Sequence, residues 1–227
     1  MSEAWGIDGY AKGWIGVALA GEGTRRFSLF PTADALFALD AAMLMIDIPI
    51  GLPESGYRGC DEAARALLPG AQSRVFLGLR RPLLHYLDDY PAANRWAKRD
   101  GKGLAKQAFH ILPKIAAVDA LMTPARQARF RESHPELVFA HLNGGTPLPS
   151  KHRAEGLQAR RTMLSRCGFT ALARWLEALR GTGAKPDDLF DACVLALAAQ
   201  EALDGHARRV DSAGRRDSRG LRMEIWY

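Results

Sequence analysis

Short apolar stretches alternate with turns near the start of the chain. Residues 4–10, 14–20 and 26–30 have the apolar character of β-strands, and glycines lie in the turn between the first two. A capped helix is predicted over residues 34–39, followed by a continuous apolar strand at 43–48. This β-β-β-α-β order predicts an antiparallel meander, followed by a strand that returns parallel through a helical crossover.

The rest of the chain is mostly helical in pattern. Helices are predicted over residues 61–68, 86–99, 107–122, 152–166, 169–180 and 187–203. A fifth strand is predicted at residues 137–140, and a final strand at 221–226 after a basic loop over 208–222. The predicted fold class is α/β, a mixed sheet of antiparallel and parallel strands flanked by helices.

One segment differs in composition from the predicted sheet. Residues 49–103 are rich in proline, glycine and arginine, and they begin where the strand at 43–48 ends. The length of 227 residues fits one large domain. We therefore expect a single domain over residues 1–227, with a helical insertion or lid at about 49–103.

Composition and charge narrow the functional classes. The net charge of +6 is compatible with a polyanionic partner. The three cysteines lie far apart with no CxxC motif, which indicates reduced thiols and a cytoplasmic protein. We expect no association with a membrane, because no apolar run is long enough to span one and no signal-peptide pattern is present.

Carboxylates stand at positions where burial would be costly. Asp8 lies within the first predicted strand, and Asp47 lies near the end of the buried strand at 43–48. If these two strands are neighbours, both side chains can face one cleft. Asp188 and Asp191 are three residues apart on the last helix, so they share a face. Glu136 precedes the predicted fifth strand.

Each acid also has a structural interpretation. Asp8 can bond to turn amides, Asp47 can cap the following loop, and Asp188 can cap the last helix. Asp191 can interact with the helix dipole, and Glu136 can pair with an arginine. Clustered carboxylates, in contrast, repel one another unless protons or cations neutralise them. Mg²⁺ and Mn²⁺ prefer such oxygen ligands, and two of these ions can promote hydrolysis of a phosphodiester.

Several motifs carry a family resemblance. They are IDGYAKGW (7–14), IDIPIGLP (46–53), RGCDEAAR (58–65), SRVF (73–76), HPELVF (134–139), KHRAEGLQAR (151–160) and DDLFDACVLAL (187–197). On these motifs the chain resembles the domain-of-unknown-function 429 family, described as predicted ribonuclease-H-like nucleases. The last motif is similar to the final acidic helix of Holliday-junction resolvases.

The resemblance implies a metal-dependent nuclease that hydrolyses phosphodiester bonds in nucleic acid, DNA or RNA, with Mg²⁺ or Mn²⁺ as cofactor. Its implied catalytic residues are Asp8, Asp47 and Asp191, and its implied metal ligands are Asp8, Asp47, Glu136, Asp188 and Asp191. Its implied substrate-binding residues are Arg58, Arg65, Lys151 and Arg160, with Arg161 beside them. The two arginines at 58 and 65 can instead pair with Asp61 and Glu62, and the other three can belong to a solvated helix face.

Two other functions stay open. The same fold can bind nucleic acid without cleaving it, since fold does not determine function. A phosphotransfer enzyme acting on a small metabolite is the third hypothesis, because the sugar-kinase and actin-like group shares a β-β-β-α-β core. The chain has one such core and no second phosphate-binding hairpin, which disfavours this hypothesis. The oligomeric state is not predicted.

Overall fold

The computed structural model describes residues 3–227, which divide into two compact units. The first comprises the chain up to Asp47, Arg129–Arg208 and Trp226–Tyr227, and the second comprises Ile48–Ala128 and Arg209–Ile225. The second unit begins next to the predicted start of the insertion at residue 49. It extends beyond residue 103 and includes a later stretch of chain. That it acts as a lid stays a prediction.

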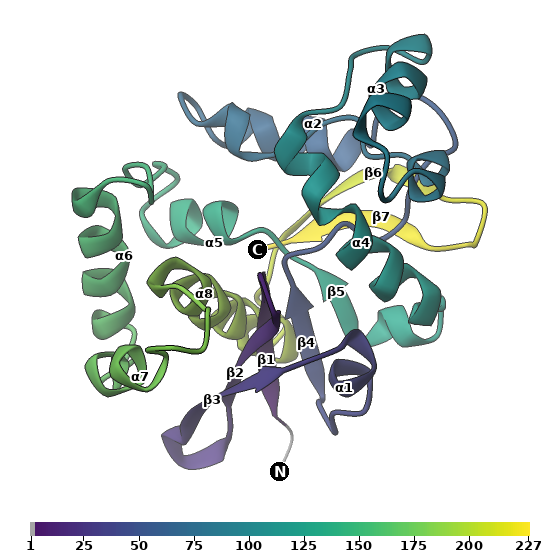
Figure 1. Ribbon diagram of the computed structural model, residues 1–227. Coiled ribbons are helices and arrows are strands. Elements are labelled where there is room, and N and C mark those ends of the chain that lie inside the picture. Colours follow the sequence, from purple (N-terminus) through teal and green to yellow (C-terminus); the bar gives the residue numbers. More distant parts are fainter. Residues whose placement is uncertain (1–2) are drawn as a thin grey trace. The chain divides into compact units, whose positions relative to one another are not determined.

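The first unit contains a five-stranded mixed sheet with the order β3-β2-β1-β4-β5 (Figure 1). Its strands are β1 (Ala4–Tyr10), β2 (Gly13–Leu19), β3 (Arg25–Phe30), β4 (Met43–Ile46) and β5 (Phe130–Glu132). The first three strands form an antiparallel meander, β4 pairs with β1 in parallel, and β5 pairs with β4 in parallel. The predicted α/β class and the pairing of the first and fourth strands are thereby confirmed.

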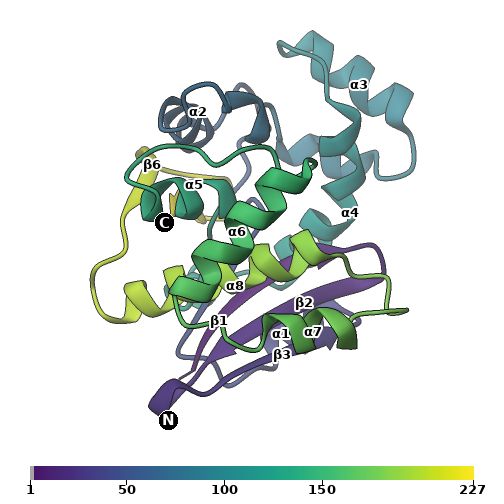
Figure 2. The same ribbon diagram turned by 90° about the vertical axis from the view of Figure 1, so that its left-hand side faces the viewer.

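Helices cover both faces of this sheet. They are α1 (Ala33–Phe37), α5 (Pro135–Leu142), α6 (Ala154–Arg166), α7 (Leu172–Ala178) and α8 (Pro186–Leu203). Figure 2 shows α8 running along β1, and the two elements are in extensive contact. On the other face, Phe37 of α1 stacks on Phe130 of β5, with ring centroids 4.2 Å apart. Since successive side chains of a strand point to opposite faces, each residue of β1 can be assigned to the α1 or the α8 side.

Gly6 allows α8 to approach β1 at backbone distance. A Cβ atom at this position would lie 2.1 Å from Ala196 N and 2.2 Å from Ala192 O of α8. No real side chain tolerates such distances, so only glycine permits this packing. The contact also sets the height of α8 above the sheet, and with it the position of the acidic first turns of the helix.

The second unit is formed mainly by helices and a β-hairpin. It contains α2 (Gly59–Ala66), α3 (Tyr90–Arg99) and α4 (Lys106–Leu121), and β6 (Arg209–Arg216) pairs with β7 (Arg222–Trp226). Short 3₁₀ helices span Gln72–Arg74, Arg81–His85 and Arg126–Ala128 in this unit, and Gly21–Gly23 in the first. The predicted basic loop over 208–222 is wrong for most of its length, because its first part is strand β6.

The predicted fifth strand at 137–140 is also wrong, since these residues belong to helix α5. A short apolar run buried on all sides looks the same in either structure, so hydrophobicity does not separate the two. The start of the run carries the helix signal instead. His134 caps α5 by accepting a hydrogen bond from Glu136 N through Nδ1, and Pro135 occupies the first turn. The fifth strand is the three-residue β5.

Two further features concern the cysteines and the helices. Cys60, Cys167 and Cys193 are all free thiols. Among residues 3–227, no helix combines the length and the apolarity needed to cross a bilayer.

We expect Gly6→Ala to lower stability by about 3 kcal/mol or more, because the new methyl group would push α8 off the sheet. In a thermal unfolding experiment this corresponds to a midpoint lower by about 6 °C or more. Gly144→Ala is the control, since Gly144 has a φ of +67° but nothing within 4 Å of an added Cβ. It should cost only about 1 kcal/mol of backbone strain. Equal midpoints for the two variants would contradict the proposed packing constraint.

Candidate active site

Strand register brings Asp8 and Asp47 side by side. Ile7 of β1 pairs with Ile46 of β4 in parallel, so the next residue of each strand is a carboxylate. The backbone continues this pairing, because Asp47 N donates a hydrogen bond to Ile7 O over 3.1 Å. Asp8 lies two residues beyond Gly6 and therefore on the same face of the sheet, the face that α8 covers. Two carboxylates from adjacent strands thus point toward the same helix.

Asp191 comes to this place from α8. It immediately precedes Ala192, whose carbonyl oxygen lies against Gly6 of β1. The Asp191 side chain is almost fully buried, at 1% exposure. Its Oδ1 atom accepts no hydrogen bond from any residue that the structure describes. The three carboxylates predicted to be catalytic therefore lie close enough for their charges to act on one another.

The electrostatics of the three acids are coupled. Burial raises the pKa of Asp8 well above its usual range, and the negative charges of Asp191 and Asp47 raise it further. Burial likewise raises the pKa of Asp191 to about 7, an effect that the positive charge of Lys151 opposes. Burial also raises the pKa of Asp47, and the charges of His134 and Lys151 lower it. Such mutually perturbed acids are typical of functional sites.

Lys151 supplies the positive charge within this cluster. Its Nζ lies 2.6 Å from Asp191 Oδ2 and 3.7 Å from Asp187 Oδ2. The nearby charges of Asp191 and Asp8 raise the pKa of Lys151 despite its burial, so the ammonium keeps its proton. The role of Lys151 as a phosphate ligand stays a prediction. In this structure its ammonium group partly neutralises the acid cluster.

Asp188 caps the helix that carries Asp191. Its Oδ2 accepts a hydrogen bond from Lys185 N over 2.7 Å, which satisfies one backbone donor at the start of α8. Burial raises the pKa of Asp188, and the hydrogen bond from Lys185 N opposes this. The charge of Asp188 also raises the pKa of Asp8, so the two groups are close. Its role as a metal ligand stays a prediction.

Glu136 and Arg160 form a buried ion pair. Arg160 Nη2 donates to Glu136 Oε1 over 2.5 Å, and Arg160 Nη1 donates to the carbonyl oxygens of Pro149 and Gly156. The guanidinium also lies over the ring of Phe139. In this arrangement Arg160 is fully buried and turned toward protein acceptors, whereas the next residue, Arg161, is exposed.

His134 is a member of the site that the sequence hypothesis did not include. It caps α5, two residues before Glu136, and its charge acts on Asp47. The signal was present in the HPELVF motif, in which a histidine and a proline precede the acid. Because that motif was interpreted as a strand, the role of His134 as the cap of helix α5 was not predicted.

Arg58 and Arg65 lie in the second unit. Arg58 is fully buried, with Nη1 3.2 Å from Asp61 Oδ1, so the expected alternative of an ion pair along α2 is present. Arg65 Nη1 donates to Val75 O over 2.8 Å. Their predicted contacts with phosphate are not tested by these interactions.

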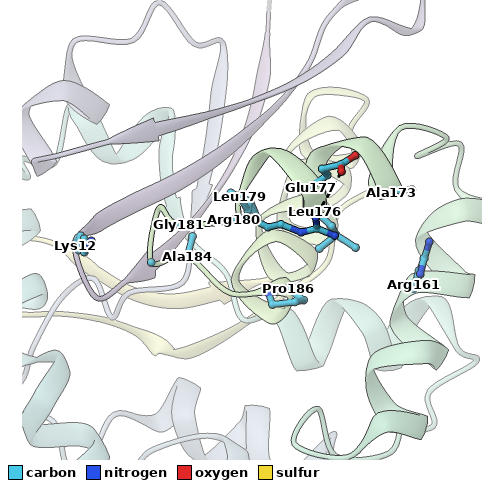
Figure 3. A pocket seen from close by; sticks show the side chains of 11 residues that line it. Lys12, Arg161, Ala173, Leu176, Glu177, Leu179, Arg180, Gly181, Ala184 and Pro186 are labelled. Carbon is cyan, nitrogen blue, oxygen red and sulfur yellow. Dashed lines mark ion pairs between the residues drawn. The ribbon is translucent and has the colours of Figure 1, made fainter.

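A basic hollow of about 700 Å³ lies in the first unit (Figure 3). It is lined by the β1–β2 turn, by α6 and α7, and by the loop that leads to α8. Its charged residues are Lys12, Arg161, Arg180 and Glu177, of which the last two form an exposed ion pair. Pro186, which also lines it, directly precedes Asp187 and Asp188. The hollow therefore reaches the residues that begin the acidic helix.

The three carboxylates are chemically suitable ligands for a hard divalent cation. Asp8, Asp47 and Asp191 offer carboxylate oxygens, which Mg²⁺ and Mn²⁺ prefer, and one of these oxygens is the buried Asp191 Oδ1 that lacks a hydrogen-bond partner. In residues 3–227, however, no group of three or more His, Cys, Asp or Glu side chains is already arranged to hold a metal ion. A cation would have to draw the carboxylates together and compete with Lys151.

Residues 6–214 match the family described as protein of unknown function (DUF429). The chain belongs to this family. The match includes β1, β4 and α8, the three elements that carry the acid cluster in this DUF429 protein. No curated protein and no solved structure matches the chain.

Replacing Asp8 with asparagine should stabilise the protein at neutral and higher pH. The folded state holds the Asp8 proton more tightly than the unfolded chain does, so wild-type stability falls as the pH rises from about 4 through the raised pKa. The Asp8→Asn side chain keeps an oxygen for the Gly9 N hydrogen bond but has no charge to bury. Thermal unfolding should show a higher midpoint for the variant at pH 8, and a difference that shrinks toward pH 4. Exposed Asp40→Asn should show neither effect, and a destabilised Asp8→Asn protein at pH 8 would refute this interpretation.

The neighbouring arginines 160 and 161 should respond very differently to truncation. Arg160→Met removes the buried guanidinium that contacts Glu136 Oε1 and should cost about 3 kcal/mol or more. Arg161→Met changes an exposed side chain and should stay within about 0.5 kcal/mol of wild type. Chemical denaturation of both variants measures the contrast. Equal stabilities would show that the Glu136–Arg160 pair does not hold α5 and α6 together.

Proposed function

We propose that this protein is a metal-dependent nuclease that hydrolyses phosphodiester bonds in nucleic acid. The observation that carries the proposal is the convergence of Asp8, Asp47 and Asp191 from β1, β4 and α8 on one face of the sheet. A mixed sheet with an antiparallel meander and parallel strands is consistent with a ribonuclease-H-like fold. The resemblance of the family motifs to predicted nucleases supports the same activity.

In this proposal, Asp8, Asp47 and Asp191 hold Mg²⁺ or Mn²⁺. A cation held by these carboxylates would supply the Lewis-acid chemistry that hydrolysis of a phosphodiester by water requires. Asp8 and Asp47 act from adjacent strands, which fixes their spacing through the sheet. Asp191 adds an oxygen from the helix that Gly6 holds against β1.

The residues around the acids position them. Asp188 closes the first turn of α8, and Arg160 holds Glu136 at the start of α5. His134 caps α5 and places its imidazole ring near Asp47. Rigid supports of this kind matter because catalytic groups act only when they are held in productive geometry.

Positive charge supports a polyanionic substrate. The chain carries a net charge of +6, and Lys12, Arg161 and Arg180 line the hollow beside the start of α8. Exposed cations on a groove attract phosphate with little dependence on base sequence. These features fit DNA and RNA alike.

One observation favours a second function, binding of nucleic acid without cleavage. Lys151 already neutralises part of the acid cluster, and the described residues hold no ready-made metal site. Under this hypothesis the carboxylates and the ammonium are a structural network. Binding would then be strongly salt-dependent and would need no divalent ion.

Asp47→Asn should abolish Mn²⁺-dependent cleavage while the fold survives. We expect the cleavage rate to fall at least about 100-fold, because loss of a direct ligand should exceed the 10- to 100-fold effects of outer groups. The assay uses labelled single-stranded, duplex and branched DNA and RNA, with circular dichroism to verify folding.

Asp40→Asn is the matched control for this assay, since it removes the same charge from an exposed site in the first unit. It should cleave at the wild-type rate. If Asp47→Asn also cleaves at the wild-type rate, the nuclease hypothesis fails. Salt-dependent binding by wild type with no cleavage of any substrate would support the non-catalytic function instead.

A further inference from the structure

The contact between Lys151 and Asp191 places a positive charge on the carboxylate that a cation would need. Asp191 has one oxygen bound to the ammonium group over 2.6 Å and another that is buried without a hydrogen bond. The ammonium group offsets part of the negative charge of this buried carboxylate. A divalent ion bound to the same carboxylate would therefore lie close to the positive charge of Lys151. At such distances two like charges repel, and they repel more strongly in a protein environment than in water.

The backbone that carries Lys151 is fixed from the other side. Arg160 Nη1 donates to Pro149 O over 2.8 Å. A Cβ atom at Gly156 would lie 2.1 Å from Ser150 O, so glycine lets this loop lie directly on the start of α6. The backbone next to Lys151 is therefore held in place. The side chain can still change conformation by rotation about the bonds of its four methylene groups.

Asp187 offers the ammonium group a second position. It lies one turn before Asp191 on α8, and its Oδ2 is 3.7 Å from Lys151 Nζ. The Asp187 side chain is 22% exposed, compared with 1% for Asp191. A rotation of the lysine stem toward Asp187 would free Asp191 and keep the charge of Lys151 paired near the surface.

We infer that Lys151 is a built-in competitor for the divalent cation, which must displace its ammonium group from Asp191 toward Asp187 in order to bind. This inference rests on the proposed metal-dependent function. In the metal-free state Lys151 stabilises the buried acid, and in the metal-bound state its displaced ammonium group pairs with Asp187 in the first turn of α8. Lys151 therefore sets the concentration of free cation at which the site is half occupied.

The test measures Mn²⁺ affinity directly by electron paramagnetic resonance of the free ion, without any activity assay. Lys151→Ala should bind Mn²⁺ at least about tenfold more tightly than wild type, because a competing unit charge is removed. Lys151→Gln provides a second neutral variant that keeps a hydrogen-bond donor for Asp191, in case the alanine variant folds poorly. Lys151→Arg keeps the charge and should not gain affinity.

Two controls assign the effect to this site. Lys98→Ala removes the same charge from an exposed position in the second unit and should leave Mn²⁺ affinity unchanged. Adding Asp191→Asn to Lys151→Ala should remove the gain. Without metal, Lys151→Ala should unfold at a lower temperature than wild type, and added Mn²⁺ should raise its midpoint by more than it raises that of wild type.

The possible results separate this inference from the nuclease proposal. If wild type binds Mn²⁺ and the neutral variants bind it equally or more weakly, competition by Lys151 is refuted while metal dependence survives. If the neutral variants bind and wild type does not, competition is supported and a metal-dependent activity of the natural chain is refuted. Absence of Mn²⁺ binding in all these proteins overturns both.

Discussion

The approach of α8 to β1 at Gly6 is the constraint on which the rest of the first unit depends. It brings a helix backbone within contact distance of a strand backbone, which only a residue without a side chain allows. Because Asp191 directly precedes Ala192 at this contact, the same approach decides where the third carboxylate lies. Core packing and the position of the third carboxylate therefore both depend on one glycine.

The acid cluster stores unfavourable electrostatic free energy. Burial and mutual repulsion raise the pKa values of Asp8, Asp47 and Asp191, and one ammonium group offsets only part of that cost. A protein selected for stability alone would place apolar or neutral side chains here. Proteins tolerate such local strain mainly where a ligand or a reaction needs it, which is the general reason for assigning function to this end of the sheet.

Much of the first unit could be predicted because its signals are local. Alternating or continuous apolar residues mark the first four strands, and the apolar stripe of residues 187–203 marks α8. The convergence of Asp8 and Asp47 followed from placing two parallel strands side by side. The fifth strand was missed because a buried apolar run fits either element, and the burial of Arg160 beside exposed Arg161 depends on distant partners that sequence spacing does not reveal. The pairing of Lys151 with Asp191 likewise joins residues 40 positions apart.

The order of segments along the chain has a consequence for biosynthesis. The strands carrying Asp8 and Asp47 leave the ribosome before α8, which covers their apolar face and ends at Leu203. Between them come the residues of the second unit from Ile48 to Ala128. Contacts of such long sequence separation slow folding. During translation, a nascent chain therefore exposes the apolar face of β1 until α8 has been made, and chaperones bind exposed apolar surface of this kind.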